Sequence, residues 1–319
     1  MNAAVVESFD RPPRYTTFAD PAPSADETLV TVAAAGLHPI VRALAAGRHY
    51  GSTGQPPFIP GVDGVGRLPS GARVLCGGAR FPFGTFAEHV VIRSAMALPL
   101  PDAIDDVTAA ALMNPGMSSW GALRERAHFV AGESVLILGA TGCAGRLAVQ
   151  ITKRFGASRI VAIGRDSQAL EETLSLGADA TLTLAQDRDI LVQAFRTELA
   201  EHPVDVVLDY LWGTPAEALL AALTQRGLSH ASRRIRYIQI GSMAAPTIAL
   251  PAEALRSSGL ELLGSGFGSV PIAKIFECIV DLLAEAARRP FTLPVTAAPL
   301  RDVEKLWNQK TDARLVFQP

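Results

Sequence analysis

The chain has 319 residues, of which 49% are hydrophobic, and it carries a formal net charge of -2 at pH 7. A chain of this length buries a sizeable core and is expected to hold two domains. Its nearly balanced charge argues against a nucleic-acid-binding protein, because such proteins usually need an excess of basic residues.

No stretch of the sequence has the pattern of a membrane or targeting segment. No apolar run approaches the roughly 18 residues that a membrane-spanning helix needs. The first residues lack the basic and apolar regions of a signal peptide. Three cysteines, Cys76, Cys143 and Cys278, are far apart in the chain and form no CxxC pair. We therefore expect a cytoplasmic protein without disulfides and without a cysteine-built zinc site.

Residues 1 to about 110 alternate short β-like runs with loops that are rich in proline and glycine. This texture is typical of a partly open all-β barrel. The runs lie at residues 3–6, 28–33, 64–68, 73–76 and 87–92. Two helical stretches follow, at residues 104–112 and 118–127, and Asn114-Pro115-Gly116 separates them. We expect this pair of helices to bridge two domains.

A glycine-rich turn between a strand and a helix is the most informative stretch of the chain. The apolar run at 135–138 predicts a strand that is buried on both faces, as in parallel sheets. The turn Ala140-Thr141-Gly142-Cys143-Ala144-Gly145 follows, and apolar residues at helical spacing continue to Phe155. A second apolar strand at 159–163 closes a βαβ unit. The turn is the dinucleotide-binding fingerprint with Ala140 in place of the first glycine.

Two glycines of this turn have separate physical roles in such a site. Gly142 lets the backbone approach a pyrophosphate, and Gly145 lets the helix pack close to the strand. The first amides of the helix have no partner within the helix and therefore attract negative charge. The alternative is an ordinary tight turn. The strand and the helix on either side favour a cofactor site over that alternative.

The end of the second strand distinguishes the two nicotinamide cofactors. An NAD site places an acidic side chain there, about 20 residues after the turn, to bind the ribose 2′-hydroxyl. This chain has Gly164-Arg165 at that point, and Asp166 lies beyond the strand. A guanidinium donates hydrogen bonds to a 2′-phosphate, whereas a carboxylate repels it. The sequence therefore favours NADPH, and the alternative for Arg165 is a solvated surface arginine.

The rest of the chain alternates predicted helices with predicted strands. The helices lie at 167–176, 188–199 and 215–223, and the strands lie at 180–183, 204–208, 236–240 and 260–264. That alternation predicts a doubly wound parallel sheet and an α/β fold. A helix at 272–287 and a final strand near 315–317 complete the predicted elements.

Several short motifs follow one another along the chain: Pro60-Gly61-Val62-Asp63-Gly64-Val65-Gly66, Gly84-Thr85-Phe86-Ala87-Glu88-His89, residues 138–145, Ile238-Gln239-Ile240-Gly241-Ser242, and residues 255–260 followed by Gly264-Ser265-Gly266. In this order and spacing they resemble the medium-chain dehydrogenase/reductase superfamily, in its zinc-independent quinone oxidoreductase and enoyl reductase branch. The resemblance covers nearly the whole chain. It implies a GroES-like β-barrel domain at residues 1–115, a Rossmann NADPH-binding domain at 116–248 and a return to the first domain at 249–319. It also implies a cofactor cleft between the domains and a homodimer.

The resemblance further implies chemistry without a metal ion. Zinc-dependent relatives carry a cysteine and a Gly-His-Glu run where this chain has Gly36-Leu37-His38 and Gly61-Val62-Asp63. A catalytic zinc ion needs roughly three nitrogen, sulfur or carboxylate ligands, and Val62 supplies none. Without a metal, the hydride of NADPH suits acceptors that need little activation, namely quinones, enals and enones.

Tyr50 and His38 are the candidate catalytic residues. In the enoyl reductase branch, a tyrosine after an Arg-x-Gly-type turn donates a proton, and residues 45–51 are the matching stretch. A phenol at Tyr50 would protonate the enolate carbon, and the alternative is a tyrosine packed beneath a barrel loop. The family commonly has asparagine where this chain has His38. An imidazole there either contacts the nicotinamide or the substrate, or it is structural.

Further cofactor contacts follow from the resemblance alone. Ser118 falls where relatives place a threonine near the nicotinamide ribose and phosphates. The remaining positions, at strand ends beside the nicotinamide and its carboxamide, are Gly241, Ser242, Ser265, Gly266 and Phe267. The expected activity is the reduction of a quinone, enal or enone by NADPH. A trans-2-enoyl thioester reductase and a non-catalytic NADPH-binding protein are the alternatives.

Overall fold

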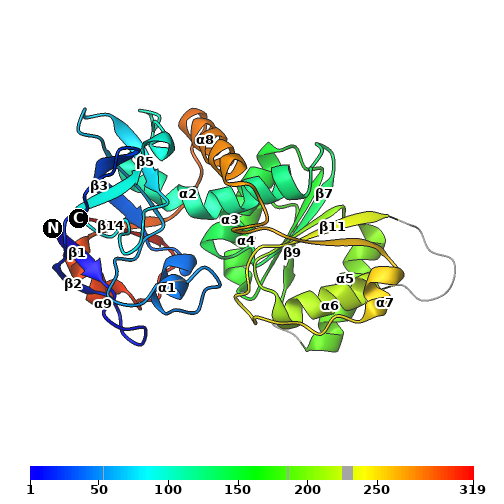
Figure 1. Ribbon diagram of the computed structural model, residues 1–319. Helices are drawn as coiled ribbons and strands as arrows, with labels where there is room; N and C mark the ends of the chain where they lie inside the picture. The colour runs from blue at the N-terminus through cyan, green and yellow to red at the C-terminus, as the bar shows by residue number, and fades with distance from the viewer. Residues whose placement is uncertain (53, 185–186, 225–232) are drawn as a thin grey trace. The chain divides into compact units, whose positions relative to one another are not determined.

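The computed structural model describes residues 1–52, 54–184, 187–224 and 233–319. The chain forms two compact units, coloured along the sequence in Figure 1. The first unit contains Met1–Pro115 and Ile279–Pro319, and the second contains Gly116–Cys278. Within the described ranges, no helix is long and apolar enough to cross a membrane.

The first unit is built mainly from β-strands. Its main sheet has the order β13 (Val295–Pro299), β14 (Arg314–Gln318), β3 (Glu27–Gly36), β4 (Asp63–Arg67) and β5 (Arg73–Gly77), and β6 (His89–Arg93) also pairs with β3. A separate ladder joins β1 (Asn2–Val5) to β2 (Arg14–Thr17). The antiparallel pairing of β14 with β3 places Val316 opposite Gly36. The last strand of the chain therefore lies in the interior of the sheet, between the C-terminal strand β13 and the N-terminal strand β3.

The core of the first unit depends on this late strand. The ring of Phe317 on β14 packs edge-on against Phe86, with 5.5 Å between ring centroids, and Trp307 packs on the same ring at 6.3 Å. All three side chains are buried. Burying one side chain of this size contributes about 1.5–3 kcal/mol, so the two ends of the chain stabilise each other through this cluster.

The structure adds short elements that the sequence did not predict. They are β2, α1 (Pro39–Ala45), the 3-10 helices Ser94–Met96 and Leu300–Asp302, α7 (Ala252–Arg256) and α9 (Val303–Leu306). Helix α1 begins at Pro39, because a proline suits the first turn of a helix, where no backbone donor is required. A proline in a short stretch is equally typical of a turn, and for this reason the sequence pattern does not predict the helix.

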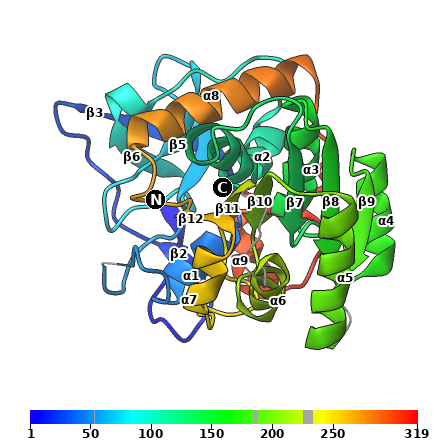
Figure 2. The ribbon, with the colours of Figure 1, turned by 90° about the vertical axis from the view of Figure 1, so that its right-hand side faces the viewer.

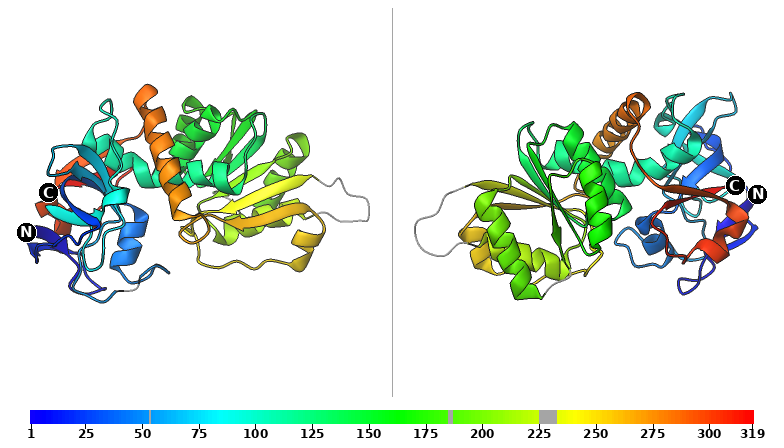
Figure 3. Two further views of the ribbon diagram at one scale, coloured as in Figure 1. Left: turned by 45° about the horizontal axis from the view of Figure 1, so that its top comes forward. Right: turned by 180° about the vertical axis from the view of Figure 1, so that it is seen from behind.

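The second unit is a doubly wound α/β domain. Its strands are all parallel and lie in the order β12 (Gly259–Gly264), β11 (Arg234–Gln239), β10 (Val206–Asp209), β7 (Ser134–Leu138), β8 (Arg159–Gly164) and β9 (Ala180–Thr183). The connecting helices are α3 (Cys143–Arg154), α4 (Ser167–Ser175), α5 (Arg188–Glu201) and α6 (Gly213–Leu223). They flank the sheet on both faces in Figures 2 and 3. The predicted α/β class with a Rossmann sheet is thus confirmed.

The strand order places a topological switch point between β7 and β10. The chain moves outward from β7 through β8 to β9, then returns to β10 and moves outward the other way. In open α/β sheets, ligands bind beyond the carboxyl ends of the strands at such a point, because the loops on either side diverge there. A ligand-binding site is therefore expected at the carboxyl ends of β7 and β10.

One helix runs through the break that the sequence predicted. Helix α2 spans Asp106–Gly121 with Pro115 in its interior, and a π-helical turn continues to Arg126. The prediction of two helices separated at Asn114-Pro115-Gly116 was therefore wrong. An interior proline costs about 3 kcal/mol, but the buried side chains of Leu112, Met113 and Leu123 each contribute a similar amount.

The second unit extends further along the chain than the sequence suggested. The Rossmann domain was expected to end at residue 248, whereas the compact second unit continues to Cys278. The reason is β12, which pairs with β11 as an edge strand of the parallel sheet and keeps residues 249–278 in this unit. Helix α8 (Ile272–Arg288) then follows, and the return to the first unit falls within that helix.

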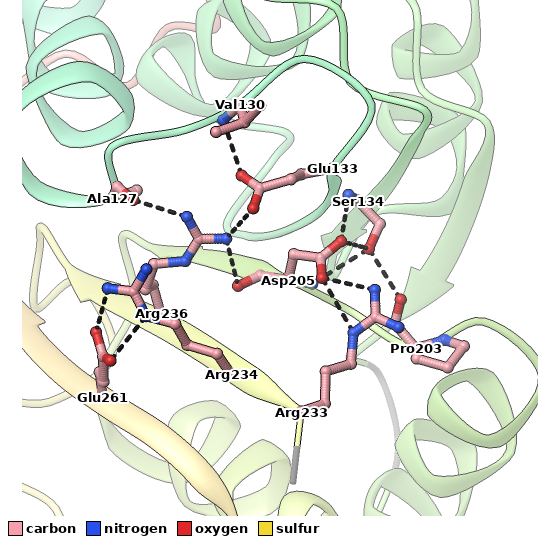
Figure 4. Close-up of polar contacts among 10 residues, drawn as sticks. All are labelled: Ala127, Val130, Glu133, Ser134, Pro203, Asp205, Arg233, Arg234, Arg236 and Glu261. Carbon is pink, nitrogen blue, oxygen red and sulfur yellow. Dashed lines mark hydrogen bonds and ion pairs between the residues drawn. The ribbon is translucent and has the colours of Figure 1, made fainter. Parts of the chain in front are cut away.

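Buried polar contacts fasten the starts of the central strands (Figure 4). Arg236 of β11 is only 3% exposed, and its guanidinium forms an ion pair with Glu133 just before β7. Asp205, just before β10, accepts hydrogen bonds from the Ser134 backbone at 2.9 Å and from Arg233 at 2.6 Å. These contacts lie at the amino ends of the strands. They hold the strand register and leave the carboxyl ends open for ligand binding.

Candidate functional site

The turn after β7 is folded against the end of β8. Gly139 adopts a φ of +89°, and the amides of Gly139 and Ala140 both donate to the carbonyl of Ile163 at 2.9 Å. Gly142 is the N-cap of α3, and no side chain caps this helix. The first amides of a helix have no intrahelical acceptor, so α3 offers backbone donors and its positive dipole end at this turn.

The glycines of the turn are required for different reasons. A Cβ atom on Gly145 would lie 2.2 Å from the carbonyl oxygen of Gly139, which is a severe clash with backbone. A Cβ atom on Gly142 would meet nothing closer than 3.8 Å, and this residue is exposed. Gly145 therefore serves the packing of α3 on the strand, whereas Gly142 keeps open the space in front of the helix. These two properties fit a dinucleotide pyrophosphate.

After the end of β8, the side chain of Arg165 is exposed, and the carboxylate of Asp166 is engaged in a helix cap. Oδ1 of Asp166 accepts the amide of Ala169 at 3.0 Å and caps α4. Arg165 is exposed and has no ion pair with any residue that the structure describes. Gly164 is buried against Thr141, whose Cγ2 would lie 2.5 Å from a Cβ atom on Gly164. The carboxylate of Asp166 is thus engaged in capping α4, whereas the exposed guanidinium of Arg165 is available to an anionic ligand.

Tyr210 follows β10 at the switch point, and the sequence analysis did not identify it. Its hydroxyl lies 3.3 Å from Oγ of Ser118, the residue expected near the nicotinamide ribose. Burial raises the pKa of Tyr210 to about 12, so the phenol keeps its proton at neutral pH. The sequence shows only that Tyr210 directly follows an apolar strand run. That position does not indicate a contact with Ser118, which lies 92 residues away along the chain.

Asp209, the last residue of β10, organises the same turn. Its Oδ1 accepts the amides of Leu211 at 2.7 Å and Trp212 at 3.0 Å, and its Oδ2 accepts the hydroxyl of Tyr237 at 2.7 Å. Burial raises the pKa of this carboxyl. Trp212 has a φ of +57°, which is strained for a bulky residue. The hydrogen bonds to Asp209 hold that strained turn in place.

The residues after β11 and β12 reach the same edge of the sheet. The amide of Gly241 donates to the carbonyl of Asp209 at 3.0 Å, and Ser242 beside it is exposed. The amide of Ser265 donates to the carbonyl of Gln239 at 2.8 Å. Gly266 follows, and Phe267, which is 46% exposed, begins a segment that lines a shallow cavity of about 530 Å³.

The second unit contains all the predicted cofactor residues, and all of them except Ser118, which is on α2, lie at or after the carboxyl ends of its strands. The predicted cofactor residues are Ser118, Ala140, Thr141, Gly142, Cys143, Ala144, Gly145, Gly164, Arg165, Gly241, Ser242, Ser265, Gly266 and Phe267. Cys143 is the first residue of α3 and is partly exposed as a free thiol. The two predicted catalytic residues, His38 and Tyr50, belong to the first unit.

His38 is buried within the first unit. Its Nε2 lies 3.1 Å from Oδ1 of Asp63, and its Nδ1 has no hydrogen-bond partner among the described residues. Asp63 is the first residue of β4, and its backbone carbonyl accepts the Thr85 hydroxyl at 2.8 Å. The imidazole is therefore held by a neighbouring carboxylate instead of projecting into solvent.

Tyr50 lies on the surface of the first unit. It is 72% exposed, and its ring lies 4.1 Å from the imidazole of His49, measured between centroids. The tyrosine is therefore not packed beneath a loop, and its phenol is accessible. No group of three or more metal-ligating side chains occurs in the part of the chain that the structure describes.

Known proteins share both the sequence pattern and this fold. A family model described as "Zinc-binding dehydrogenase" matches residues 143–285. A probable NADPH-dependent quinone reductase of Emericella nidulans is 27% identical, and the alignment covers 100% of both chains. The crystal structure of the quinone oxidoreductase from Thermus thermophilus matches with a TM-score of 0.79 and 26% identity over 100% of both chains. The chain belongs to the medium-chain dehydrogenase/reductase superfamily.

Within this superfamily, the similarities point to the quinone oxidoreductase-like branch. A second kind of relative is part of a multidomain enzyme. One component of the phenolphthiocerol/phthiocerol polyketide synthase of Mycobacterium tuberculosis is 32% identical over 69% of this chain. The matched part is about a tenth of that protein, since the alignment covers 10% of its length. A segment similar to this chain therefore also occurs inside a larger synthase.

Proposed function

We propose that this protein is an NADPH-dependent oxidoreductase that transfers a hydride to a quinone or to an α,β-unsaturated carbonyl compound. The observation that carries the proposal is the end of β8, where Asp166 is engaged in capping α4 and Arg165 is exposed. A free guanidinium beside the turn after β7 suits the 2′-phosphate of NADPH. The relatives from Emericella nidulans and Thermus thermophilus, both named for quinone reduction, support the same activity.

The residues of the second unit would bind and orient the cofactor. The first amides of α3 would receive the pyrophosphate, since Gly142 leaves the space in front of them open. Ser118, hydrogen-bonded to Tyr210, would contact the nicotinamide ribose. NADPH, when bound, supplies the hydride. The exposed segment at Ser265 to Phe267 would meet the carboxamide and fix the face that the ring presents.

The reaction is proposed to need no zinc. Val62 cannot ligate a metal, and the nearby His38 and Asp63 form a hydrogen bond with each other. Two potential ligands are fewer than the three protein ligands that catalytic zinc sites usually have. Dialysis against a chelator should leave the rate unchanged. Loss of activity that zinc alone restores would contradict this part of the proposal.

The proton that completes the reduction comes from different sources for the two substrate classes. A reduced quinone exchanges the protons on its oxygens with water. An enone receives hydride at its β-carbon and then requires a proton at its α-carbon, for which we propose Tyr50 as the donor. Its exposed phenol supports that role. His38 is proposed to position neighbouring groups, because its imidazole is buried against Asp63.

A substrate panel tests the proposed activity. Oxidation of NADPH is followed by absorbance with quinones, enals, enones and enoyl thioesters, and NADH is tested in parallel. Turnover of quinones or enones with a preference for NADPH is the expected result. Tight NADPH binding without turnover of any electrophile would instead indicate a non-catalytic NADPH-binding protein.

A trans-2-enoyl thioester reductase is the second candidate. The observation that favours it is the 32% identity to a component of a polyketide synthase, since such synthases handle acyl thioesters. The panel separates the two candidates. A ratio of kcat/KM for an enoyl thioester over a simple enone well above tenfold would favour the thioester reductase.

We also propose a cytoplasmic homodimer. Strand β12 is an edge strand of the parallel sheet, and the family expectation is a pair of subunits. Cys76, Cys143 and Cys278 are far apart in the sequence and form no CxxC pair, a pattern that favours a reducing compartment. Light scattering on a sizing column should give twice the chain mass of 33.7 kDa. A monomer at micromolar concentration would contradict the dimer.

A further inference from the structure

Two arginines of the first unit lie on either side of the segment that joins β3 to α1. Arg314, the first residue of β14, donates from Nη1 to the carbonyl of Leu37 at 2.8 Å. Arg42 on α1 donates from Nε to the carbonyl of Trp307 at 2.9 Å. Burial and the nearby charge of Arg314 lower the pKa of Arg42. Arg314 therefore contacts the end of the segment that leads into α1, and Arg42 lies on α1 itself; the first side chain is buried and the second is half-buried.

Neither guanidinium has an acidic partner in the part of the chain that the structure describes. Arg314 is 8% exposed, and its Nε is buried without any hydrogen-bond partner there. Both side chains donate instead to backbone carbonyls. Burying a charge without a counter-charge is costly, because a carbonyl dipole replaces water only in part.

Three other arginines, one buried and two partly buried, each have an acidic partner. Arg236, at 3% exposure, forms an ion pair with Glu133. Arg159 pairs with Glu198 at 2.8 Å, and Arg146 with Glu172 at 2.6 Å. This chain therefore usually supplies a carboxylate to a buried guanidinium. The absence of one at Arg314 calls for a counter-ion from outside the described chain.

We propose that Arg42 and Arg314 form a binding site for a small oxyanion, either a phosphate or a carboxylate group. A guanidinium binds such groups through parallel N–H donors, and the unused Nε of Arg314 supplies one of them. Arg42 is only half-buried, so part of its side chain is in contact with solvent. The oxyanion is either a free ion or the acidic group of a larger molecule. The site itself does not depend on the proposed reductase activity.

Thermal unfolding in inorganic phosphate tests the site directly. Phosphate is titrated against chloride at equal ionic strength, with wild type, Arg42→Gln, Arg314→Gln and the exposed control Arg93→Gln. We expect a saturable rise in Tm for wild type and the control, and at least tenfold weaker binding in the other two variants. Because the turn before α3 is also expected to bind phosphate, the difference between wild type and Arg42→Gln measures the site.

Two results would overturn the proposal. One is an equal saturable response in wild type and both variants, and the other is a purely linear rise in every protein, which is the general effect of phosphate on protein stability. If Arg314→Gln does not fold, Arg314→Lys replaces it. The lysine variant keeps the charge but loses the fork of donors, and it should bind phosphate with intermediate affinity.

A second measurement identifies the source of the oxyanion. Phosphate is added to the NADPH oxidation assay with a neutral enone and with an enone that carries a carboxylate. Competition against the charged substrate alone, abolished in Arg42→Gln, assigns the site to the acidic group of a substrate. Unchanged rates with both substrates, together with the Tm result, assign it to a free ion. The unfolding experiment stands even when the protein turns over neither substrate.

Discussion

The hydroxyl of Tyr237 donates a hydrogen bond of 2.7 Å to Oδ2 of the buried Asp209. The two residues lie on neighbouring strands, β11 and β10, and Asp209 is the last residue of β10, at the carboxyl end where the candidate site lies. The same carboxylate holds the strained turn at Trp212. A single buried acid therefore links the sheet to the loop at the switch point, and its titration affects the whole turn.

Asp209 should give the folded protein a specific dependence on pH. Burial raises its pKa above the ordinary value of 3.8, so the folded state binds this proton more tightly than the unfolded state. The free energy of unfolding loses this contribution as the pH rises from 3.8 through the folded pKa. In Asp209→Asn, which keeps an acceptor oxygen, this dependence is absent. Urea unfolding from about pH 4 to pH 7 should show the advantage of wild type over the variant shrinking, and a constant difference would contradict the assignment.

Arg165→Ala should abolish most of the preference for NADPH. We expect wild type to bind NADPH at least tenfold more tightly than NADH, which is about 1.4 kcal/mol and within the range of one charge-assisted contact. Titration calorimetry with both cofactors measures the ratio. Asp166→Ala is the matched control, since it removes the α4 cap, costs about 1 kcal/mol of stability and leaves the preference intact. Equal affinity of wild type for the two cofactors would disprove the role of Arg165.

Alanine at the two turn glycines should separate folding from cofactor binding. Gly145→Ala places a methyl group 2.2 Å from the Gly139 carbonyl oxygen, and it should lower the unfolding free energy by about 1–3 kcal/mol. Gly142→Ala meets open space, so its Tm should stay near that of wild type, while its methyl group obstructs the pyrophosphate and weakens NADPH binding. Differential scanning fluorimetry with and without NADPH distinguishes the two effects. A Gly142→Ala protein with unchanged NADPH affinity would place the pyrophosphate elsewhere.

Tyr50→Phe should separate the two substrate classes. The substitution removes only the hydroxyl of an exposed side chain, so stability and NADPH affinity should not change. Turnover of an enone should fall at least about tenfold if the phenol is the donor, and turnover of a quinone should fall much less. His38→Asn restores the family's usual residue and should affect both substrates mildly. Wild-type enone turnover in Tyr50→Phe would assign the proton to water.

The sequence predicted the second unit better than the first. The apolar runs that became β7 and β8, with the turn between them, are local patterns whose meaning depends little on distant residues. The continuous helix through Pro115 was missed, because buried side chains on both sides outweighed a local breaker. Helix α1 was missed because seven residues carry too little periodicity to identify it.

The residues of the candidate site also divide into those that a local motif predicts and those that only the tertiary fold brings together. Gly142, Gly145 and Arg165 could be predicted as cofactor residues because the fingerprint has fixed spacing within one βαβ unit. The contact between Tyr210 and Ser118 joins residues 92 positions apart, and no motif connects them. The contact of Arg314 with the carbonyl of Leu37 depends on the return of β14 to β3, which the sequence pattern did not specify. Long-range contacts of this kind depend on the tertiary fold.

The central position of β14 in the first sheet has a consequence for biosynthesis. The second unit is one continuous segment, Gly116–Cys278, and has all its strands once about the first 280 residues have been made. The first unit instead lacks an inner strand until Arg314–Gln318 leave the ribosome. Until then, Ala35 and Gly36 at the end of β3 lack their partner strand and the ring of Phe86 lacks Phe317. The nascent chain is thus expected to acquire its nucleotide-binding half first, and premature termination near the C-terminus would leave an aggregation-prone product.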